Sequence, residues 1–363
     1  MMRRLYAAMV FAIGSILAAG CGGSDVSSPA SPDPSPNQTI TFPSGTSFTV
    51  IASPDVVPVS ENATPQFPTG NDDDGLADVP EKFGMAETDT TYQLWKEVCD
   101  WATNAARGAN VYTFANAGQN GTDGTNGYAG FDTSVSTQYP VTMVNWRDAI
   151  VWCNALTEYY NANNGSRTDL RVVYCSDAAY TTPIRESTNS KTVTNTAAGS
   201  LDCPYVNPDA KGFRLPTSME YEFAARYIGT TAPSQKNYVL KDGVYYCTRR
   251  SASGATAESS DNVATSLVAV FYRNYTDAST YASVNGTARV KSKAANALGL
   301  YDMSGNVFKW NFDWHPSFAG SRRVERGGSY SDYYTYLFNS GNVQSYDPFS
   351  SDGSTGFRIE RTN

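Results

Sequence analysis

Histidine, a residue type that often does chemistry, occurs once in this sequence, and cysteine occurs six times. The one histidine, His315, has no partner whose orientation can be argued for in a Ser-His-Asp triad, and we interpret it as a surface residue. A Gly-rich run at 115–131 lacks the Lys-Ser/Thr of a phosphate-binding loop and the terminal Glu of an EF-hand, so we interpret it as a structural loop. Beyond Cys21 the number of cysteines is odd, so at least one is unpaired: Cys99, Cys153, Cys175, Cys203 and Cys247.

A tract near the C-terminus, residues 329–355, is the segment best suited to recognition. It holds seven Ser, five Tyr, three Asp, two Asn and two Phe, and no Lys, Arg, Glu, Ala, Ile, Met, Trp or Cys. Tyr supplies a large rigid contact area at small entropic cost, and Ser, Gly and Asn supply adaptable hydrogen bonds, as in antibody paratopes. The alternative, that these rings form ordinary core, is disfavoured because Leu337 and Val343 are the only aliphatic members. The composition therefore predicts a binding surface displayed on a rigid scaffold.

The N-terminal residues indicate export and a lipid anchor. Residues 1–20 have two Arg, an apolar run and small residues before Cys21, which is typical of a signal peptide and too short for a spanning helix. The ending LAAGC is similar to the bacterial lipoprotein box, in which the Cys is lipidated. We expect Cys21 to hold the protein at the bacterial outer membrane or cell surface, with the Ser/Pro-rich residues 21–46 as a tether.

Residues 47–363 are expected to form one α+β domain. Apolar residues recur at helical spacing in three segments, which we predict to be helices: 88–104, 145–161 and 215–227. In the third, Thr217 and Glu220 form a T-x-x-E capping box. Met219, Phe223 and Tyr227 line one face of this helix, which is expected to face the core.

Composition also bears on which partners the chain can bind and on whether its cysteines form disulfides. The formal net charge is −8 at pH 7 and no basic footprint is visible, which excludes a nucleic-acid partner. Disulfides are allowed in an exported chain. Cys175 and Cys203 flank an insertion-like segment and are the favoured pair, whereas Cys99 and Cys153 fall on apolar helical faces and are expected to be free.

Six segments, taken in order, resemble the motif string of the formylglycine-generating-enzyme group: KFGMAETDTTYQLW, PVTMVNWRDAIVWCNALT, FRLPTSMEYEFAAR, NALGLYDMSGNVFKWNFDW, RVERGGS and GFRIER. The resemblance runs from about residue 80 to the C-terminus. It implies the C-type lectin fold in its enlarged formylglycine-generating version, with few helices, short twisted strands and long loops packed over them. GNVFKW and RGGS would then belong to core strands, and the segments between RGGS and GFR would reach the surface.

The sequence departs from the enzymes of that group where their chemistry is done. They carry a reactive Cys pair between RGGS and GFR, where copper and substrate thiol meet, but 329–355 has no Cys, and Cys247 lies outside any matching motif. Related sulfoxide synthases need several His for non-haem iron, and this chain has one. Lys309 replaces the Glu of the group's GNVWEW motif and Phe308 the preceding Trp, so a calcium site using that Glu would lose a ligand. We predict no catalytic residue, no metal and no cofactor.

A second subgroup uses the same scaffold without those catalytic residues: the variable proteins of diversity-generating retroelements, including the variable lipoproteins of oral spirochaetes. In that subgroup, template copies mutated at adenines replace the DNA for the C-terminal end. Asn codons then become codons that never encode Lys, Glu, Gln, Trp or Met, and 329–355 obeys this except at Gln344. A patch around Trp310 and Trp314 has a similar composition.

The resemblance to variable proteins implies a variable ligand-binding region at about 306–356. Its predicted ligand-binding residues are Phe308, Asn311, Phe312, Asp313, His315, Tyr330, Ser331, Asp332, Tyr333, Tyr334, Tyr336, Phe338, Asn342, Gln344, Ser345, Tyr346, Asp347, Phe349, Ser351 and Asp352. A scaffold role is expected for Trp310, Trp314, Gly327, Gly328, Phe357 and Arg358.

The sequence therefore predicts a monomeric surface lipoprotein that binds a protein or glycan ligand on another cell or host surface. Its only link to a membrane would be the lipid anchor. Two alternatives stay open: a formylglycine-generating-like oxidase with relocated catalytic cysteines, and a structural lipoprotein that kept the scaffold without a site.

The lipid anchor can be tested by replacing its attachment residue. Cys21→Ala should release the mature protein into soluble fractions, because the tether carries no other segment that would hold it on a bilayer. Fractionation of cells expressing each form measures this. Continued membrane association of the variant would contradict the anchor.

Overall fold

The computed structural model describes residues 38–41, 47–52, 66–69, 73, 75–79, 83–121, 138–164, 169–191, 194–272, 286–332 and 339–362. The chain divides into two units, Met1–Asp33 and Pro34–Asn363. The first unit, with the predicted signal peptide and Cys21, lies outside the described residues. Across the described ranges, no helix is both long and apolar enough to cross a membrane.

The three predicted helices are confirmed, and each begins where a polar side chain caps it. Thr91 caps α1, Asn145 caps α2 and Thr217 caps α3. The last two caps are reciprocal capping boxes completed by Asp148 and Glu220, which satisfy main-chain N–H groups left open at a helix start. The helical elements are α1 (Tyr92–Ala102), η1 (Ala105–Asn110), α2 (Trp146–Asn163), α3 (Ser218–Arg226), α4 (Asn262–Ser266) and η3 (Pro316–Phe318).

The prediction that Met219 is buried is wrong. Phe223 is fully buried on α3, but Met219 is 42% exposed. By helical spacing Met219 shares the face of Glu222 and Phe223. It lies one turn nearer the N-terminus, however, where that face borders a cavity rather than the core.

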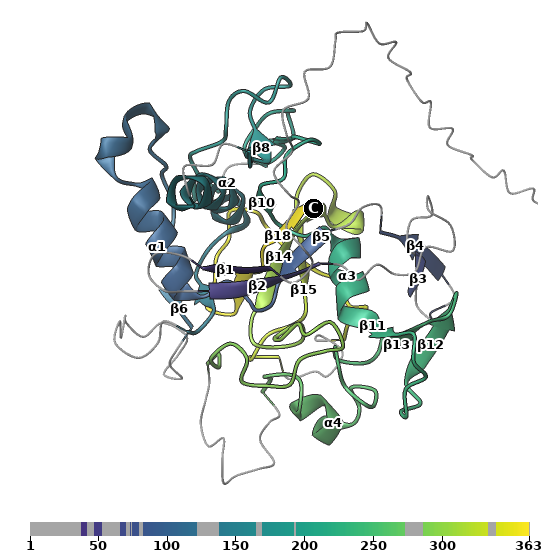
Figure 1. The fold of residues 1–363 in the computed structure, drawn as a ribbon. Helices are drawn as coiled ribbons and strands as arrows, with labels where there is room; N and C mark the ends of the chain where they lie inside the picture. The colour runs from purple at the N-terminus through teal and green to yellow at the C-terminus, as the bar shows by residue number, and fades with distance from the viewer. Residues whose placement is uncertain are drawn as a thin grey trace, which may run out of the picture. The chain divides into compact units, whose positions relative to one another are not determined.

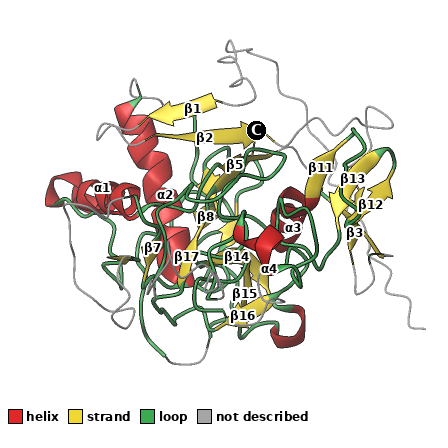
Figure 2. Ribbon diagram, turned by 90° about the horizontal axis from the view of Figure 1, so that it is seen from below, coloured by secondary structure: helices red, strands yellow, loops and turns green. Residues whose placement is uncertain are grey.

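A four-stranded sheet carries the C-terminal motifs in the strand order β16–β15–β14–β17 (Figure 2). Its strands are β14 (Phe308–Trp314), β15 (Arg323–Arg326), β16 (Gln344–Tyr346) and β17 (Thr355–Phe357). β14 runs antiparallel to β15 and parallel to β17, and its register with β15 shifts between Trp310 and Trp314. α3 packs on β14 and β15, so the tract between β15 and β17 begins and ends beside this helix and sheet.

A five-stranded antiparallel sheet in the order β1–β2–β5–β18–β10 joins the two ends of the domain. Its strands are β1 (Gln38–Thr41), β2 (Ser47–Ala52), β5 (Phe83–Ala86), β10 (Phe213–Arg214) and β18 (Glu360–Thr362). Because β1 pairs with β2, the sheet begins inside the segment predicted as a tether. The domain boundary therefore lies before Gln38 rather than at residue 47.

The remaining strands of the described domain form small antiparallel sheets. They are β3 (Gln66–Thr69) with β4 (Gly75–Asp78), β6 (Gln119–Asn120) with β7 (Val141–Thr142), β8 (Tyr174–Cys175) with β9 (Tyr205–Val206), and β11 (Tyr227–Gly229), β13 (Val244–Cys247) and β12 (Tyr238–Lys241). Figure 1 shows α1 and α2 on one side of β14 and β18, and α3 on the other. The few helices, short strands and long loops confirm the predicted α+β class.

The largest core cluster is built around stacked aromatic rings. Trp95 of α1 and Trp152 of α2 stack with ring centroids 5.7 Å apart. Phe357 of β17 meets both indoles edge-on, at 5.9 and 5.3 Å, and is fully buried. Trp310 is buried in the same cluster, which therefore ties both helices to the sheet that carries the tract.

The predicted disulfide between Cys175 and Cys203 does not form. Both thiols are free, as are the three other cysteines of the described ranges. Cys175 instead pairs through its main chain with Tyr205 on β9 and with Pro183. Adjacency along an insertion was a weak guide, because β-pairing rather than a cross-link closes this segment.

The division between core and surface rings can be tested on stability. Phe357→Ala should lower the free energy of unfolding by about 3–5 kcal/mol, because it opens a cavity between Trp95 and Trp152. Tyr346→Ser is the matched ring removal at an exposed position and should cost about 1 kcal/mol, the size of its ring contact with Trp310. Thermal melts of both variants measure this. Equal destabilisation would mean that the Tyr346 ring belongs to the core.

Candidate functional site

The tract between β15 and β17 is held to the domain chiefly through its main chain. Tyr330 donates its main-chain N–H to the carbonyl of Asn306 at 2.8 Å, and Ser340 donates to that of Ser251 at 2.9 Å. β16 pairs with β15 in the middle of the tract. Further main-chain bonds run from Gly341 N to Arg249 O, Arg147 N to Pro348 O, Met143 N to Asp352 O and Phe308 N to Ser354 O. Contacts of this kind survive a change of side chain in the tract.

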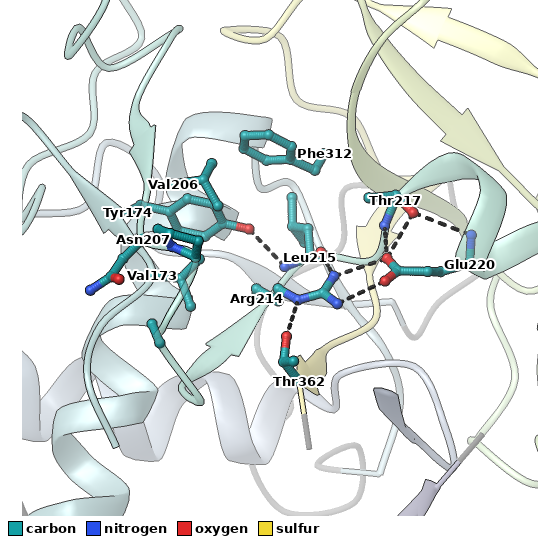
Figure 3. A pocket seen from close by; sticks show the side chains of 12 residues that line it. Val173, Tyr174, Val206, Asn207, Arg214, Leu215, Thr217, Glu220, Phe312 and Thr362 are labelled. Carbon is teal, nitrogen blue, oxygen red and sulfur yellow. Dashed lines mark hydrogen bonds and ion pairs between the residues drawn. The ribbon is translucent and has the colours of Figure 1, made fainter. Parts of the chain in front are cut away.

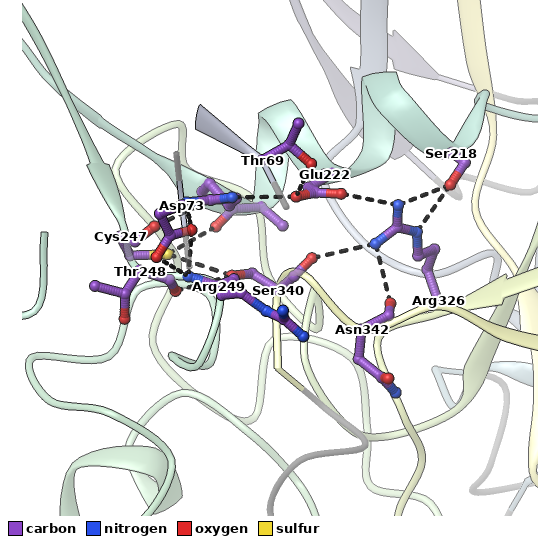
Figure 4. A network of polar contacts seen from close by, with 12 residues as sticks. Thr69, Asp73, Ser218, Glu222, Cys247, Thr248, Arg249, Arg326, Ser340 and Asn342 are labelled. Carbon is purple, nitrogen blue, oxygen red and sulfur yellow. Dashed lines mark hydrogen bonds and ion pairs between the residues drawn. The ribbon is translucent and has the colours of Figure 1, made fainter. Parts of the chain in front are cut away.

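Arg326 of β15 fastens the tract to α3, as Figure 4 shows. Its guanidinium is buried and donates to the carbonyl of Asn342 at 3.0 Å. It also donates to Ser218 Oγ at 2.7 Å and to the carboxylate of Glu222 at 2.9 Å. Glu222 is shared with Arg226, 3.1 Å away. Arg326 thus holds the main chain of the tract against the first turn of α3.

The structure distributes the predicted ligand-binding residues over three degrees of burial. Asn311 and Asp332 are buried, and Ser331 and Tyr346 are exposed. The partly buried members are Phe308, Phe312, Asp313, His315, Tyr330, Asn342, Gln344, Ser345, Asp347, Phe349, Ser351 and Asp352. Tyr333, Tyr334, Tyr336 and Phe338 lie outside the described residues.

Asn311 and Asp332 are not available to a ligand in this conformation. The Asn311 amide is fully buried and donates to the main-chain carbonyls of Pro216 and Thr217, both at 3.3 Å. Asp332 accepts the main-chain N–H of Ser329 at 2.6 Å and closes the turn that follows β15. Both side chains therefore satisfy main-chain groups, which a surface position would not require.

A cavity of about 340 Å³, here called the α3 pocket, lies between the tract and the start of α3. Tract residues, the end of β14 and the first turns of α3 line it together with residues from distant elements: Thr69, Ser218, Met219, Glu222, Arg249, Asp313, Trp314, Pro316, Val324, Arg326, Gly341 and Val343. Asp313 is the predicted ligand-binding residue that it contains. Its carboxylate accepts the main-chain N–H of Ser218 at 2.5 Å, and burial raises its pKa.

A second cavity of about 220 Å³, here called the β10 pocket, is lined in part by Thr217 and Glu220 at the start of α3 (Figure 3). Phe312 is its one predicted ligand-binding residue. The Phe312 ring stacks on Tyr174 with centroids 5.4 Å apart. Arg214 and Glu220 at the edge of this pocket are 2.8 Å apart, and this pairing holds the pKa of Glu220 down to about 2 despite its burial. The polar groups of the β10 pocket are thus already paired.

Trp314 and His315 support the end of β14. The buried guanidinium of Arg323 lies 3.5 Å from the Trp314 ring and 3.8 Å from the Trp146 ring, so it is held between two indoles. His315 caps η3, where its Nδ1 accepts the main-chain N–H of Ser317 at 3.2 Å. Burial and the neighbouring Arg322 and Arg326 lower the pKa of His315. This histidine therefore has a local structural role.

Lys309 stands where the GNVWEW motif has Glu, so a buried cation occupies the position of that carboxylate. Its ammonium is fully buried, donates to the Gly305 carbonyl at 2.5 Å and lies 3.7 Å from the Asp89 carboxylate. Burial lowers the pKa of Lys309 to about 8. Among the described residues, no group of three or more His, Cys, Asp or Glu side chains is placed to hold a metal ion.

Sequence reasoning missed the residues that line the α3 pocket from outside the tract. Met219, Glu222 and Arg249 come from α3 and from the segment after β13. The capping box at Thr217 was the available signal, because it places Ser218 and Met219 in the first turn of α3. The neighbour of that turn could not be read from the sequence.

A lectin-like scaffold that displays a surface tract between two of its strands defines the structural class: the C-type lectin fold in its formylglycine-generating form. The chain belongs to the family described as the sulfatase-modifying factor enzyme 1-like domain, which matches residues 35–363. Two solved structures share the fold. Treponema denticola variable protein 1 is 22% identical with a TM-score of 0.56, covering 90% of this chain and 99% of that one. CarF is also 22% identical, with a TM-score of 0.54, covering 85% and 100%.

Relatives with related sequences match over shorter lengths. Chaperone protein LppX of Paenibacillus barcinonensis is 28% identical over 201 residues, which cover 53% of this chain and 59% of that protein. The formylglycine-generating enzyme of Streptomyces coelicolor is 38% identical over 88 residues, covering 20% of this chain and 28% of the enzyme. The chain therefore spans less than two thirds of either relative.

Glu325 of β15 is a buried carboxyl beneath the tract. Its Oε1 accepts the hydroxyl of Thr355 at 3.0 Å, and within the described ranges no Lys or Arg forms an ion pair with it. Burial, with Asp352 and Asp332 nearby, raises the pKa of Glu325 from 4.5 to about 8. Burial also raises the pKa of Asp332 to about 6.

The raised pKa of Glu325 predicts that stability falls as pH rises. Between about pH 4.5 and 8 the unfolded chain has lost this proton while the folded chain keeps it, so each pH unit costs up to about 1.4 kcal/mol. Glu325→Gln keeps an acceptor for Thr355 and removes that contribution. Urea unfolding from pH 5 to 8 should therefore show a shallower decline for the variant. Parallel declines in the two proteins would contradict a protonated Glu325.

Proposed function

We propose that the protein is a surface-displayed lipoprotein that binds varied ligands through C-terminal side chains diversified by a retroelement. The observation that carries this proposal is the main-chain attachment of the tract. Contacts at Tyr330, Ser340 and Gly341, the pairing of β16 and the Arg326 bond to Asn342 all use main-chain atoms. A segment held in this way accepts new side chains without losing its position, which is what a diversified binding site requires.

The fold shared with Treponema denticola variable protein 1 supports the proposal, since a variable protein is built on this scaffold. The exposed and partly buried rings of the tract, including Tyr346 and Phe349, suit it as well. Tyr side chains supply large contact areas with few rotatable bonds and often dominate binding energy.

Under this proposal the chain does not oxidise the cysteine of a substrate. Cys247 is the thiol that packs against the tract, 3.6 Å from Ser340 Oγ. It is fully buried, and burial raises its pKa, so the nucleophilic thiolate is disfavoured. Burial likewise raises the pKa of Cys99, Cys153 and Cys175. Nothing in these environments favours a relocated catalytic pair.

The partner and the location belong to the same proposal. The lipoprotein box at Cys21 and the Ser/Pro-rich tether support attachment to the outer membrane or cell surface. The acidic net charge of −8 disfavours nucleic acid and leaves a protein or glycan on another cell as the expected partner. The chain is expected to act as a monomer without a cofactor.

The DNA around the coding region tests the proposal directly. A retroelement predicts a nearby reverse transcriptase gene and a near-copy of the 3′ coding end that differs only where the template has adenines. Sequencing related isolates should place substitutions at Tyr330, Ser331 and Tyr346, and leave Arg326 unchanged, because Arg326 holds the tract in place. Substitutions spread evenly over the domain would contradict diversification.

The enzymatic alternative is tested on the purified chain. Incubation with a sulfatase-type cysteine peptide, with and without copper, should leave the peptide unchanged by mass spectrometry. The matched control is an authentic formylglycine-generating enzyme under the same conditions. Conversion of the peptide by this chain would replace the binding proposal with the oxidase alternative.

A further inference from the structure

We propose that the α3 pocket is an anchor subsite that takes one aromatic side chain bearing a hydrogen-bond donor, a tyrosine or tryptophan, from a protein ligand. This inference rests on the proposed function, because the pocket borders the tract. It adds a ligand class, and it divides the subsite into walls that stay constant and a polar tip that changes with the tract.

The walls of the pocket fit a ring. Met219, Trp314 and Pro316 present apolar surface, and the Met219 side chain is 42% exposed although it extends from a helix face that is otherwise buried. A thioether makes favourable contacts with aromatic rings and adjusts to their shape. An indole such as Trp314 gains from edge or offset contact with a second ring. The volume of about 340 Å³ lies at the lower end of small-ligand sites and suits one large side chain.

The charges of the pocket favour a neutral ring over a cationic side chain. Arg249 and Arg326 line the pocket together with the carboxylates of Glu222 and Asp313, so the formal charges balance and a lysine or arginine gains no net attraction to offset its lost hydration. A guanidinium attracts the face of an aromatic ring. Glu222 is not open to a cation of the ligand, because Arg226 and Arg326 already pair with its carboxylate.

Asp313 supplies the polar tip. One carboxylate oxygen accepts the main-chain N–H of Ser218 at 2.5 Å, and no Lys or Arg of the described residues forms an ion pair with the group. Burial raises the pKa of Asp313, so its charged form gains from a further donor. A buried Tyr hydroxyl or Trp indole N–H requires a partner of this kind. The ring and the carboxylate therefore complement each other.

The constancy of the walls follows from where their residues come from. Met219 and Glu222 belong to α3 and Arg249 to the segment after β13, all outside the predicted variable region. Trp314 and Pro316 lie inside it but have structural roles, because the Trp314 ring lies against the Arg323 guanidinium and Pro316 begins η3. Asp313 and Val343 lie inside that region. Diversification would therefore keep a ring-sized cavity, and a change at Asp313 would alter the group at its end together with the acceptor of the Ser218 N–H. In this chain that group is an acceptor.

The test uses methionine methyl groups as reporters in the mature chain. The chain is labelled with [¹³C-methyl]methionine. Met219 lines the pocket and reports on it, and the buried Met85 and Met303 serve as references. The signal of Met219 is assigned by its loss in Met219→Leu. N-acetyl-L-tryptophanamide should shift the Met219 signal saturably at millimolar concentration and leave the two references unmoved. N-acetyl-L-tyrosinamide should do the same, and the leucine and lysine analogues should bind at least tenfold more weakly.

Two matched variants isolate the polar tip. Asp313→Asn keeps the acceptor for Ser218 and should weaken tryptophanamide binding about tenfold, the effect of losing a charged acceptor. Asp347→Asn makes the same charge change in the tract outside the pocket, and should alter binding less than twofold. An unmoved Met219 signal, or a lysine analogue that binds as well, overturns the subsite. Equal effects of the two variants overturn the role of Asp313. None of these outcomes depends on the retroelement evidence, so the subsite and the proposed function can fail separately.

Discussion

Buried guanidinium groups that donate to main-chain carbonyls are the interaction on which this fold depends. A loop-rich domain has many carbonyls without a partner in a helix or sheet, and leaving them unpaired in the interior is costly. Arg358 donates to the carbonyls of Ala86 and Tyr301, and Arg323 to those of Phe312 and Asp202. Arg326 does the same for the tract. Arginine suits this task because its planar group offers five donors in a fixed geometry and stays charged when buried.

Because the tract is held through its main-chain carbonyls, its position depends little on which side chains it carries. The exceptions show where that separation ends. Ser340 is buried and its hydroxyl donates to the carbonyl of Thr248 at 3.4 Å, and Asp332 closes a turn with its carboxylate. At these two positions the side chain is part of the framework, so free substitution there would move the main chain. The surface available for recognition is therefore narrower than the Ser- and Tyr-rich composition indicates.

Local signals in the sequence predicted local structure well, and tertiary placement poorly. The caps at Asn145 and Thr217 fix their helices through bonds within a few residues, so the pattern was sufficient to find them. The exposure of Met219 depends on a cavity formed by segments far away in the chain, which no periodicity of α3 could reveal. Composition marked the tract as a recognition surface but did not separate Asn311, whose amide is needed at the start of α3, from exposed neighbours.

The irregularity of β14 explains why one short patch serves two cavities. In a regular strand, alternate residues face opposite sides, so Phe312 and Trp314 would share a face. The register with β15 shifts between Trp310 and Trp314, and Phe312 reaches the β10 pocket while Asp313 and Trp314 both line the α3 pocket. Bulged strands often re-aim side chains next to functional sites. Phe312 is packed between Trp146 and Tyr174, which ties its identity to the core. Asp313 lies beyond that packing, so a substitution there would leave the rings behind it in place but would remove the acceptor of the Ser218 main-chain N–H.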